Sequence, residues 1–226
     1  MDLTEYVQRL LSRRSRDDEP LRIVQAGHPA LRGPMREARG RLEPELLRAL
    51  VQAMVVTMRD APGVGLAAPQ IGVPLRLFVA EDRIAAADRD PEDDLLERVP
   101  FSLRTVLDPS YRAVSSETVF AHEGCLSVDG LSSIVPRARR IAFRGSLLQE
   151  DGTLVEVDEE HSGWPARILQ HETDHLDGIL CHDLCVPRSL VDSRYAARWA
   201  DLSEAIEGLG LSGPITQLAP GEVVLR

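Results

Sequence analysis

The sequence predicts an α+β fold. Two segments, residues 44–60 and 164–177, repeat apolar side chains at helical spacing. Between them lie short runs of apolar and β-branched residues, which predict strands. The composition, with 43% hydrophobic and 27% charged residues over 226 positions, is that of a globular chain with one domain and extensions.

Residues 1–20 predict an amphipathic N-terminal extension, because five apolar residues recur there at helical spacing: Leu3, Tyr6, Val7, Leu10 and Leu11. The charged stretch 13–19 then predicts a linker. In the next helix, 44–60, proline is the first residue, which a first helical turn tolerates. The sequence Asp-Ala-Pro-Gly at 60–63 ends that helix.

Four runs after this helix predict strands, at 75–80, 105–107, 141–148 and 153–157. Between the first two lies an acidic insert, at about residues 81–98. Its first seventeen residues, 81–97, hold eight acids against two arginines. A charge run of this kind is usually a solvated surface, so we expect a surface loop here.

The helix at 164–177 has signals at both ends. Ser162 can cap its start, Pro165 fits its first turn, and Gly178 suits the left-handed position after its end. Residues 193–207 predict a third helix with a packing face made of Tyr195, Trp199, Leu202 and Ile206. The stretch 211–226 predicts no more than a loose tail.

The charge and the cysteine count exclude several classes of protein. A net charge of −10 argues against a nucleic-acid-binding surface, which needs a basic face. No apolar run approaches the roughly 18 to 20 residues that cross a bilayer. Three cysteines are too few for a disulfide scaffold, and the N-terminus lacks the pattern of a secretory signal. We therefore expect a cytoplasmic protein with no membrane partner.

The helix at 164–177 carries the pattern His-Glu-x-x-His. Because residues four apart lie one above the other on a helix, His171 and His175 can bind one metal ion. Glu172 is then placed to contact a water molecule on the ion without binding the ion itself. A catalytic site normally has three protein ligands, so the pattern predicts a third ligand elsewhere.

Two cysteines can supply the third ligand. Cys181 stands where some zinc peptidases have a further histidine, and Cys125 lies in the segment Glu-Gly-Cys-Leu-Ser at 123–127. A cysteine by itself is more often a small buried hydrophobe than a ligand. Cys181 and Cys185 with His182 could also form a second metal site, although no further ligand motif surrounds them.

A third patch, Gly-Val-Gly-Leu-Ala-Ala-Pro-Gln at 63–70, has glycines at alternate positions, which let another chain or a ligand approach the backbone. The three patches together resemble the peptide deformylase family. Its motifs are Gly-aliphatic-Gly-aliphatic-Ala-Ala-x-Gln, Glu-Gly-Cys-aliphatic-Ser and Gln-His-Glu-x-x-His-aliphatic, and this chain carries them in that order. We assign the catalytic domain to residues 21–190, after the extension 1–20 and before a C-terminal helix and tail at 191–226.

The resemblance implies a fold, a reaction and a metal site. The fold is antiparallel β-sheets around the central helix with the His-Glu-x-x-His motif. The reaction is a metal-dependent hydrolysis that removes the N-terminal formyl group from formyl-methionyl nascent polypeptides and releases formate. Cys125, His171 and His175 are the implied metal ligands. Ferrous iron, Fe²⁺, is the implied ion, and Zn²⁺, Ni²⁺ or Co²⁺ can replace it.

The resemblance also implies roles for other residues of the motifs. Glu172 takes a proton from water and delivers it to the departing amine. The Gln70 side-chain amide and the Leu126 backbone N–H stabilise the tetrahedral oxyanion, and loss of one such donor typically costs about 10²- to 10³-fold in rate. Glu123 and Arg137 form an ion pair that braces the cysteine segment.

The peptide substrate needs a strand partner and an apolar pocket. Gly65 resembles the family's backbone contact, which aligns the peptide as an added strand. Trp164 and Ile168 share one helix face with the first histidine, and with Val64 they are the predicted pocket for the methionine side chain. The implied partner is an N-formylmethionyl peptide at the ribosome exit, and we expect the protein to be a monomer.

Two alternative functions remain open from the sequence. A zinc endopeptidase that uses Cys181 as its third ligand predicts that Cys181→Ser, and not Cys125→Ser, abolishes metal binding. A non-catalytic decoy that sequesters a hydroxamate-type inhibitor predicts tight inhibitor binding without turnover.

Overall fold

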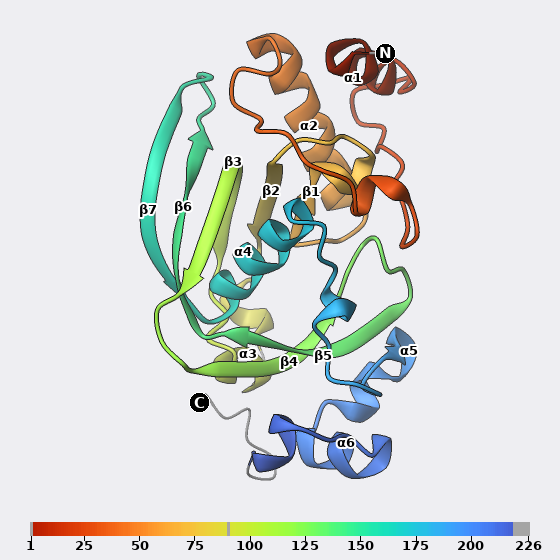
Figure 1. Ribbon diagram of the computed structural model, residues 1–226, viewed down its shortest axis with the longest axis vertical. Coiled ribbons are helices and arrows are strands. Elements are labelled where there is room, and N and C mark those ends of the chain that lie inside the picture. The colour runs from red at the N-terminus through yellow and green to blue at the C-terminus, as the bar shows by residue number, and fades with distance from the viewer. Residues whose placement is uncertain (1, 90, 219–226) are drawn as a thin grey trace.

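A computed structural model describes residues 2–89 and 91–218, and it places one helix between two antiparallel sheets (Figure 1). That helix, α4 (Gly163–Leu176), contacts strands of both sheets and is buried along most of its length. The larger sheet has the strand order β1-β2-β3-β6-β7, and the smaller one has the order β4-β5-β8. The predicted α+β fold with antiparallel sheets around a central helix is confirmed.

All neighbouring strands pair antiparallel. The strands are β1 (Gly65–Ala67), β2 (Leu77–Asp82), β3 (Phe101–Ala113), β4 (Thr118–Gly124), β5 (Leu131–Ala138), β6 (Arg140–Leu148), β7 (Leu154–Ser162) and β8 (Val191–Asp192). The four predicted strands fall within or across β2, β3, β6 and β7. The pair β4–β5 was not predicted, because its residues include glycine, serine and proline, which are typical of turns.

The helices of the described residues are α1 (Leu3–Leu11), α2 (Pro44–Asp60), α3 (Pro91–Leu95), α4, α5 (Ser193–Ala196) and α6 (Leu202–Leu209). Short 3₁₀ turns lie at Pro29–Leu31, Ala68–Ile71, Ala86–Asp88, Cys181–Asp183, Ala197–Trp199 and Pro214–Gln217. Helix α2 has the predicted bounds. No helix of the described residues is long and apolar enough to span a membrane.

Strand β2 is buried on both faces, which explains its uninterrupted apolar run. Successive side chains of a strand point to opposite faces. Leu77 and Val79 accordingly belong to the core that α2 forms on one face. Phe78 and Ala80 belong to the core on the other face, which includes residues of α4. The sheet therefore holds α4 at a fixed position relative to β1 and β2.

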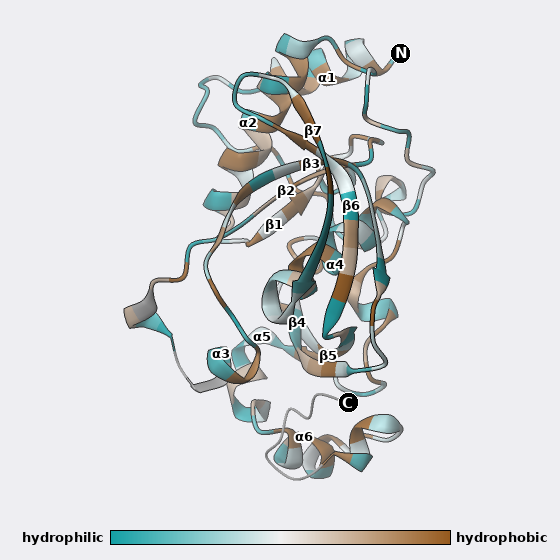
Figure 2. Ribbon diagram, turned by 90° about the vertical axis from the view of Figure 1, so that its left-hand side faces the viewer, coloured by the Kyte–Doolittle hydropathy of each residue, from teal (hydrophilic) through white to brown (hydrophobic). Residues whose placement is uncertain are grey.

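Strand β7 is the far edge of this sheet and is largely exposed. Its acidic part is teal in Figure 2, and two of its acidic side chains pair with arginines of the adjacent strand β6. Asp158 pairs with Arg144, and Glu160 pairs with Arg140. Charges along an edge strand discourage pairing with another chain. This strand lies away from the residues that form the site described below.

Helix α1 forms as predicted and packs against α2 at one end of the molecule. Asp2 caps it, because the Asp2 side chain accepts a hydrogen bond from the backbone N–H of Glu5. Val7 is 0% exposed and belongs to the same core as α2. The N-terminal extension is therefore attached to the domain through apolar contacts.

We expect Val7→Ala to lower the free energy of unfolding by about 1–2 kcal/mol, because it removes about two buried methyl groups at about 0.8 kcal/mol each. Urea denaturation measures the change, with Gln8→Ala as the control, since Gln8 is exposed on the same helix. Equal stability of the two variants would show that α1 does not stabilise the domain.

The prediction of a solvated loop at 81–98 is partly wrong. Asp82 and Asp93 are only 3% and 8% exposed, and Arg98 donates hydrogen bonds to both carboxylates. The Arg98 guanidinium also lies over the Trp164 ring, with Cζ 5.5 Å from the ring centroid. The charge run does not reveal this arrangement, because the pairing depends on how the insert folds back against α4.

The start of α4 differs from its prediction. The Ser162 side chain makes no capping hydrogen bond. Gly163 opens the helix with φ of +63°, and a Cβ there would lie 2.4 Å from Cβ of Glu97, so glycine is required at this position. Gly178, after the helix, has φ of +73° as its predicted left-handed position requires.

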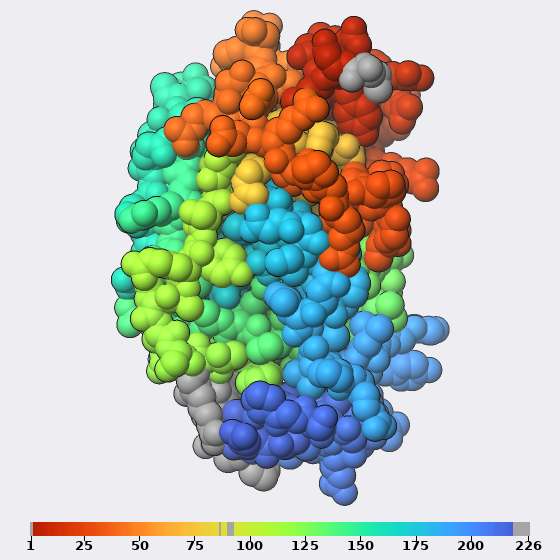
Figure 3. Space-filling view, in the orientation of Figure 1, coloured from red at the N-terminus to blue at the C-terminus, as the bar shows by residue number. Residues whose placement is uncertain are grey.

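The single helix predicted at 193–207 is wrong. Asp201 takes an extended backbone and accepts hydrogen bonds from the N–H groups of Ser203 and Glu204, so it starts the separate helix α6. Trp199 and Leu202 pack in a third core, whereas Tyr195 is exposed. This core also includes buried residues of the predicted tail, and residues 219–226 lie outside the described residues. The C-terminal segment lies at the end opposite α1 (Figure 3).

Candidate active site

Helix α4 carries the His-Glu-x-x-His residues in the interior of the protein. Glu172 and His175 are 3% and 1% exposed. Because the helix is enclosed by both sheets, its polar residues are buried together with its apolar ones. The spacing of four residues places the rings of His171 and His175 next to each other, with centroids 4.9 Å apart.

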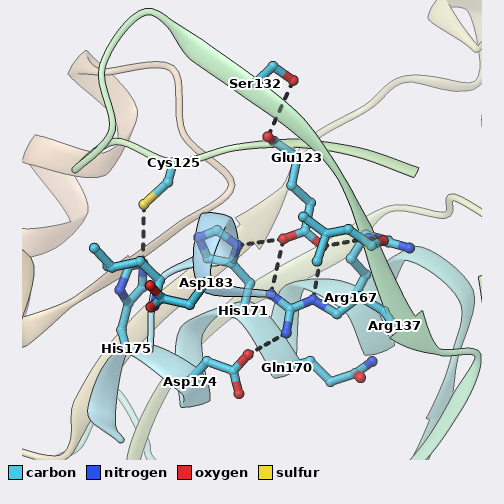
Figure 4. A network of polar contacts seen from close by, with 12 residues as sticks. Glu123, Cys125, Ser132, Arg137, Arg167, Gln170, His171, Asp174, His175 and Asp183 are labelled. Atoms are coloured by element: carbon cyan, nitrogen blue, oxygen red, sulfur yellow. Dashed lines mark hydrogen bonds and ion pairs between the residues drawn. The ribbon is translucent and has the colours of Figure 1, made fainter. Parts of the chain in front are cut away.

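Cys125 approaches the two histidines from the end of β4, a strand of the smaller sheet. It follows β4 directly, in a turn in which the Val128 N–H donates to the Cys125 carbonyl at 2.8 Å. Its Sγ lies 3.4 Å from Nε2 of His175 (Figure 4). One ligand atom each of Cys125, His171 and His175 lies within 4.8 Å of the others. The structure thus brings the three predicted metal ligands together.

Glu123 orients His171 from within a buried network of charges. His171 Nδ1 donates to Glu123 Oε2 at 3.0 Å, which leaves Nε2 available to a metal. Arg137 donates twice to the same carboxylate, at 2.9 and 3.0 Å, and Arg167 donates once. The predicted ion pair between Glu123 and Arg137 is present, and Arg167 is a partner that was not predicted.

The charges of this network shift the pKa values of its members. Burial opposes ionisation of Glu123, but Arg137 and Arg167 hold its pKa well below the usual value. Burial lowers the pKa of His171, but the hydrogen bond to Glu123 and the negative charges of Glu123 and Glu172 together outweigh burial and raise this pKa to about 9. Burial holds the pKa of His175 well below its usual value.

Asp174 connects the network to β3 of the larger sheet. No role for this residue was predicted from the sequence. Its carboxylate pairs with Arg137 and accepts a hydrogen bond from the Tyr111 hydroxyl at 2.8 Å. The sequence offered one signal, since an aspartate in the middle of a buried helix needs a partner. It did not show which arginine or tyrosine that partner is.

The Glu172 carboxylate lies between α4 and β1. Burial raises its pKa to about 7. Its Oε2 is buried and has no hydrogen-bond partner among the residues the structure describes. A Cβ on Gly65 would lie 2.2 Å from Glu172 Oε1, so the carboxylate occupies space that only glycine leaves open.

We expect Gly65→Ala to lower kcat/KM of the hydrolysis that the sequence resemblance implies by about 10²-fold. The added methyl group displaces the Glu172 carboxylate, and a displacement of about 1 Å at a reacting group costs that much. The fold should remain, because β1 accepts alanine in an extended backbone. Gly33→Ala is the control, because its Cβ would make only a 3.4 Å contact with the Pro29 carbonyl oxygen. Unchanged turnover in Gly65→Ala would mean that the Glu172 carboxylate need not stay where it lies.

Gln70 is held in one orientation beside the cysteine. Its Oε1 accepts a hydrogen bond from the Ala67 N–H at 2.7 Å, so its Nε2 points toward Ser127 and Cys125. That Nε2 donates to Ser127 Oγ at 3.3 Å and lies 3.7 Å from Cys125 Sγ. The Ser127 N–H also donates to Cys125 Sγ, at 3.4 Å. The site therefore has fixed N–H donors next to the sulfur.

A cavity of about 600 Å³ opens in front of these residues. Its walls include nine of the ten residues predicted for the site: Val64, Gly65, Gln70, Cys125, Leu126, Trp164, Ile168, His171 and Glu172. His175 is not part of the wall. Trp164, Ile168 and Val64 also pack against the core on this face of the sheet, so their role in packing and their place in the cavity coexist.

Cys181 also lies near the predicted metal ligands, but it belongs to a second set of potential ligands. Its sulfur forms a potential metal site with Glu123 and His171. Glu123 is already engaged by two arginines, so it has little capacity to bind a cation. Cys181 with both histidines, the set of a zinc endopeptidase, is not among the groups that converge in the described residues, and Cys185 and His182 belong to none there.

The residues fit a divalent metal ion. One sulfur and two imidazole nitrogens are a donor set suited to zinc, iron, cobalt or nickel. Glu172 Oε2, buried without a protein partner, also fits a site in which a water molecule or a substrate atom supplies the missing hydrogen bond.

Comparisons with known proteins identify relatives of this chain. A sequence model of the polypeptide deformylase family matches residues 20–189. Peptide deformylase 3 of Streptomyces avermitilis is 46% identical in an alignment of 200 residues that covers 86% of this chain and 86% of that protein. Peptide deformylase 1 of Streptomyces coelicolor is 41% identical in an alignment of 215 residues that covers 94% of each chain. The Met-Ala-Ser-bound crystal structure of a class I type b peptide deformylase from Acinetobacter baumannii has a TM-score of 0.61 at 30% identity, over 74% of this chain and 99% of that chain.

Proposed function

Because the chain belongs to the polypeptide deformylase family, we propose that its cavity binds an N-formylmethionyl peptide and that the residues around Glu172 carry out the hydrolysis. The reaction is metal-dependent removal of the formyl group from nascent polypeptides, with release of formate. The observation that carries the assignment of roles is the convergence of Cys125, His171 and His175 beside the buried Glu172.

Cys125, His171 and His175 are the proposed metal ligands. When bound, a divalent ion supplies a Lewis acid that polarises a carbonyl and lowers the pKa of water toward about 7. We propose Fe²⁺ as the native ion, in line with the family resemblance. The orientation of His171 by Glu123 supports this ligand set, because a carboxylate on the far ring nitrogen is the usual partner of a metal-binding histidine.

Glu172 is the proposed proton carrier. Its carboxylate accepts a proton from the attacking water and delivers it to the nitrogen of the departing amine. Burial, which raises its pKa to about 7, suits both steps, since a general base works best with a pKa near the working pH. The free Oε2 faces no protein donor among the described residues, so it can accept that proton.

The Gln70 amide and the Leu126 N–H are the proposed donors to the oxyanion. Gln70 needs no reorganisation, because the Ala67 N–H already fixes its Oε1. A donor that is oriented before the reaction stabilises developing charge more effectively than one that must turn. Gln25 Nε2 donates to the Leu126 carbonyl at 3.0 Å and so supports the backbone at that position.

Strand β1 is the proposed partner of the peptide backbone. It is an edge of the larger sheet, and Gly65 within it lines the cavity. An extended peptide can therefore add to β1 as a further strand, with main-chain hydrogen bonds supplying affinity. The methionine side chain then fits the apolar wall of Val64, Trp164 and Ile168.

Formate release from formyl-Met-Ala tests the function, with bound metal measured on the same sample. The protein is purified without oxygen, because oxidation of Fe²⁺ or of the Cys125 thiolate imitates inactivity. We expect rapid release with one metal ion per chain. Metal-loaded protein that releases no formate, even with Ni²⁺, would contradict the assignment and would favour a binder of formyl-peptide analogues.

The setting of the enzyme is also a proposal. We infer a cytoplasmic monomer that acts on peptides as they leave the ribosome, with residues 1–20 and 191–226 as extensions of the catalytic domain. Sedimentation at several concentrations tests the monomer, and a concentration-dependent rise in mass would contradict it.

A further inference from the structure

Cys181 lies beside the proposed metal centre and has no role in the proposed reaction. It begins the short turn that follows α4, and it is 4% exposed. Its sulfur is within 4.8 Å of a ring nitrogen of His171. The Cys125 sulfur is likewise within 4.8 Å of a ring nitrogen of His171, so both thiols approach the same imidazole ring.

The turn that carries Cys181 is held firmly in place. Asp183 accepts a hydrogen bond from the Leu180 N–H at 2.7 Å, and its carboxylate pairs with Arg32. Arg32 also donates to the Gly178 carbonyl at 2.7 Å. The position of Cys181 beside Cys125 is therefore set by contacts that do not involve either thiol.

The two thiols differ in how a small molecule reaches them. Cys125 is only half-buried and lines the cavity of about 600 Å³, whereas Cys181 is buried and is not part of the cavity wall. A small oxidant that enters the cavity meets Cys125 first. An accessible sulfur with a second cysteine poised beside it is the arrangement of a reversibly oxidised pair.

We propose that Cys125 and Cys181 form a disulfide when the protein meets hydrogen peroxide. The Cys125 sulfur attacks one peroxide oxygen, the O–O bond breaks, and Cys125 becomes a sulfenic acid as the first water leaves. The Cys181 sulfur then attacks the Cys125 sulfur, the S–O bond breaks, and the hydroxide leaves with the Cys181 proton as a second water. Two thiols and one peroxide thus give one disulfide and two waters.

The consequence rests on the proposed function, in which Cys125 is a metal ligand. Because a metal binds the thiolate and not a disulfide sulfur, the disulfide releases the ion and stops turnover. It also prevents further oxidation of Cys125 to the irreversible sulfinic and sulfonic acids. A reductant then restores the ligand, so the inactivation is reversible.

Mass spectrometry of zinc-loaded protein treated with hydrogen peroxide tests the pair. In the wild type we expect a mass decrease of two hydrogen atoms, a Cys125–Cys181 linked peptide after digestion, and release of zinc. Dithiothreitol should restore the mass and the zinc content. Cys185→Ser is the matched control and should behave as the wild type, because Cys185 belongs to no potential metal group among the described residues.

The Cys181→Ser variant should instead gain oxygen atoms at Cys125. Dithiothreitol should restore neither its mass nor its zinc content. A cooperative thermal unfolding transition before oxidation is the control for folding of Cys181→Ser. If this variant does not fold, Cys181→Ala takes its place in the experiment. A wild type that gains oxygen without a linked peptide, or a link to Cys185, would overturn the disulfide. Zinc content and formate release before peroxide treatment report on the proposed function separately.

Discussion

Glu172→Gln is expected to lower kcat/KM for formate release by at least about 10³-fold, within the range for loss of a positioned general acid–base group. Glutamine has nearly the same shape, so it keeps the close approach to Gly65 and the packing of α4. It cannot accept the proton of the attacking water. The ligand side chains are untouched, so the metal content should stay at that of the wild type.

The measurement pairs steady-state formate release with metal analysis of the same preparation. Glu207→Gln is the control, since Glu207 is exposed on α6 and is not part of the cavity wall. A Glu172→Gln enzyme with full turnover would remove Glu172 as proton carrier. Loss of both metal and activity would mean that Glu172 supports the ligands instead of moving the proton.

Glu123→Ala is expected to give the largest loss of stability, about 3–5 kcal/mol in the free energy of unfolding. The substitution leaves the buried guanidinium groups of Arg137 and Arg167 without their shared carboxylate. It also removes the hydrogen-bond acceptor of His171, so metal affinity should fall by about 10- to 100-fold.

Urea denaturation of the metal-free protein and metal titration measure these two effects. The control is Glu160→Ala, which breaks an exposed pair with Arg140 and should cost about 0–1 kcal/mol. Similar losses for the two variants would show that the buried network contributes no more than a surface ion pair. Unchanged metal affinity would contradict the orienting role of Glu123.

The elements that could be predicted from the sequence are those set by local patterns. Helix α2 has the predicted bounds, because its apolar residues, its first proline and its terminal Pro-Gly act within a few turns of backbone. The pair of histidines on α4 is equally local, since four residues bring two side chains to one face of any helix. The three motifs also identified the family without knowledge of the fold.

Short-range signals failed where a distant partner decides the structure. Asp82 and Asp93 appeared solvated in the sequence, yet Arg98 and the packing of the insert bury them. The stripe at 193–207 fitted one helix, yet the Asp201 side chain satisfies the N–H groups of a new helix and divides the segment. In each case, hydrogen bonds that the local sequence pattern does not reveal decided the structure.

The sequence by itself determined which side chains can perform the chemistry: a thiol, two imidazoles four residues apart and a carboxylate beside one of them. Only the tertiary structure decided which of them meet. Cys125 reaches His175 across 50 positions of the chain, because β4 pairs with β5, β5 packs on α4, and Glu123 of β4 binds side chains of α4. The tertiary structure also brings Cys181 close to His171, the histidine that Cys125 approaches. Contacts between distant positions depend on strand register and burial, which no local pattern encodes.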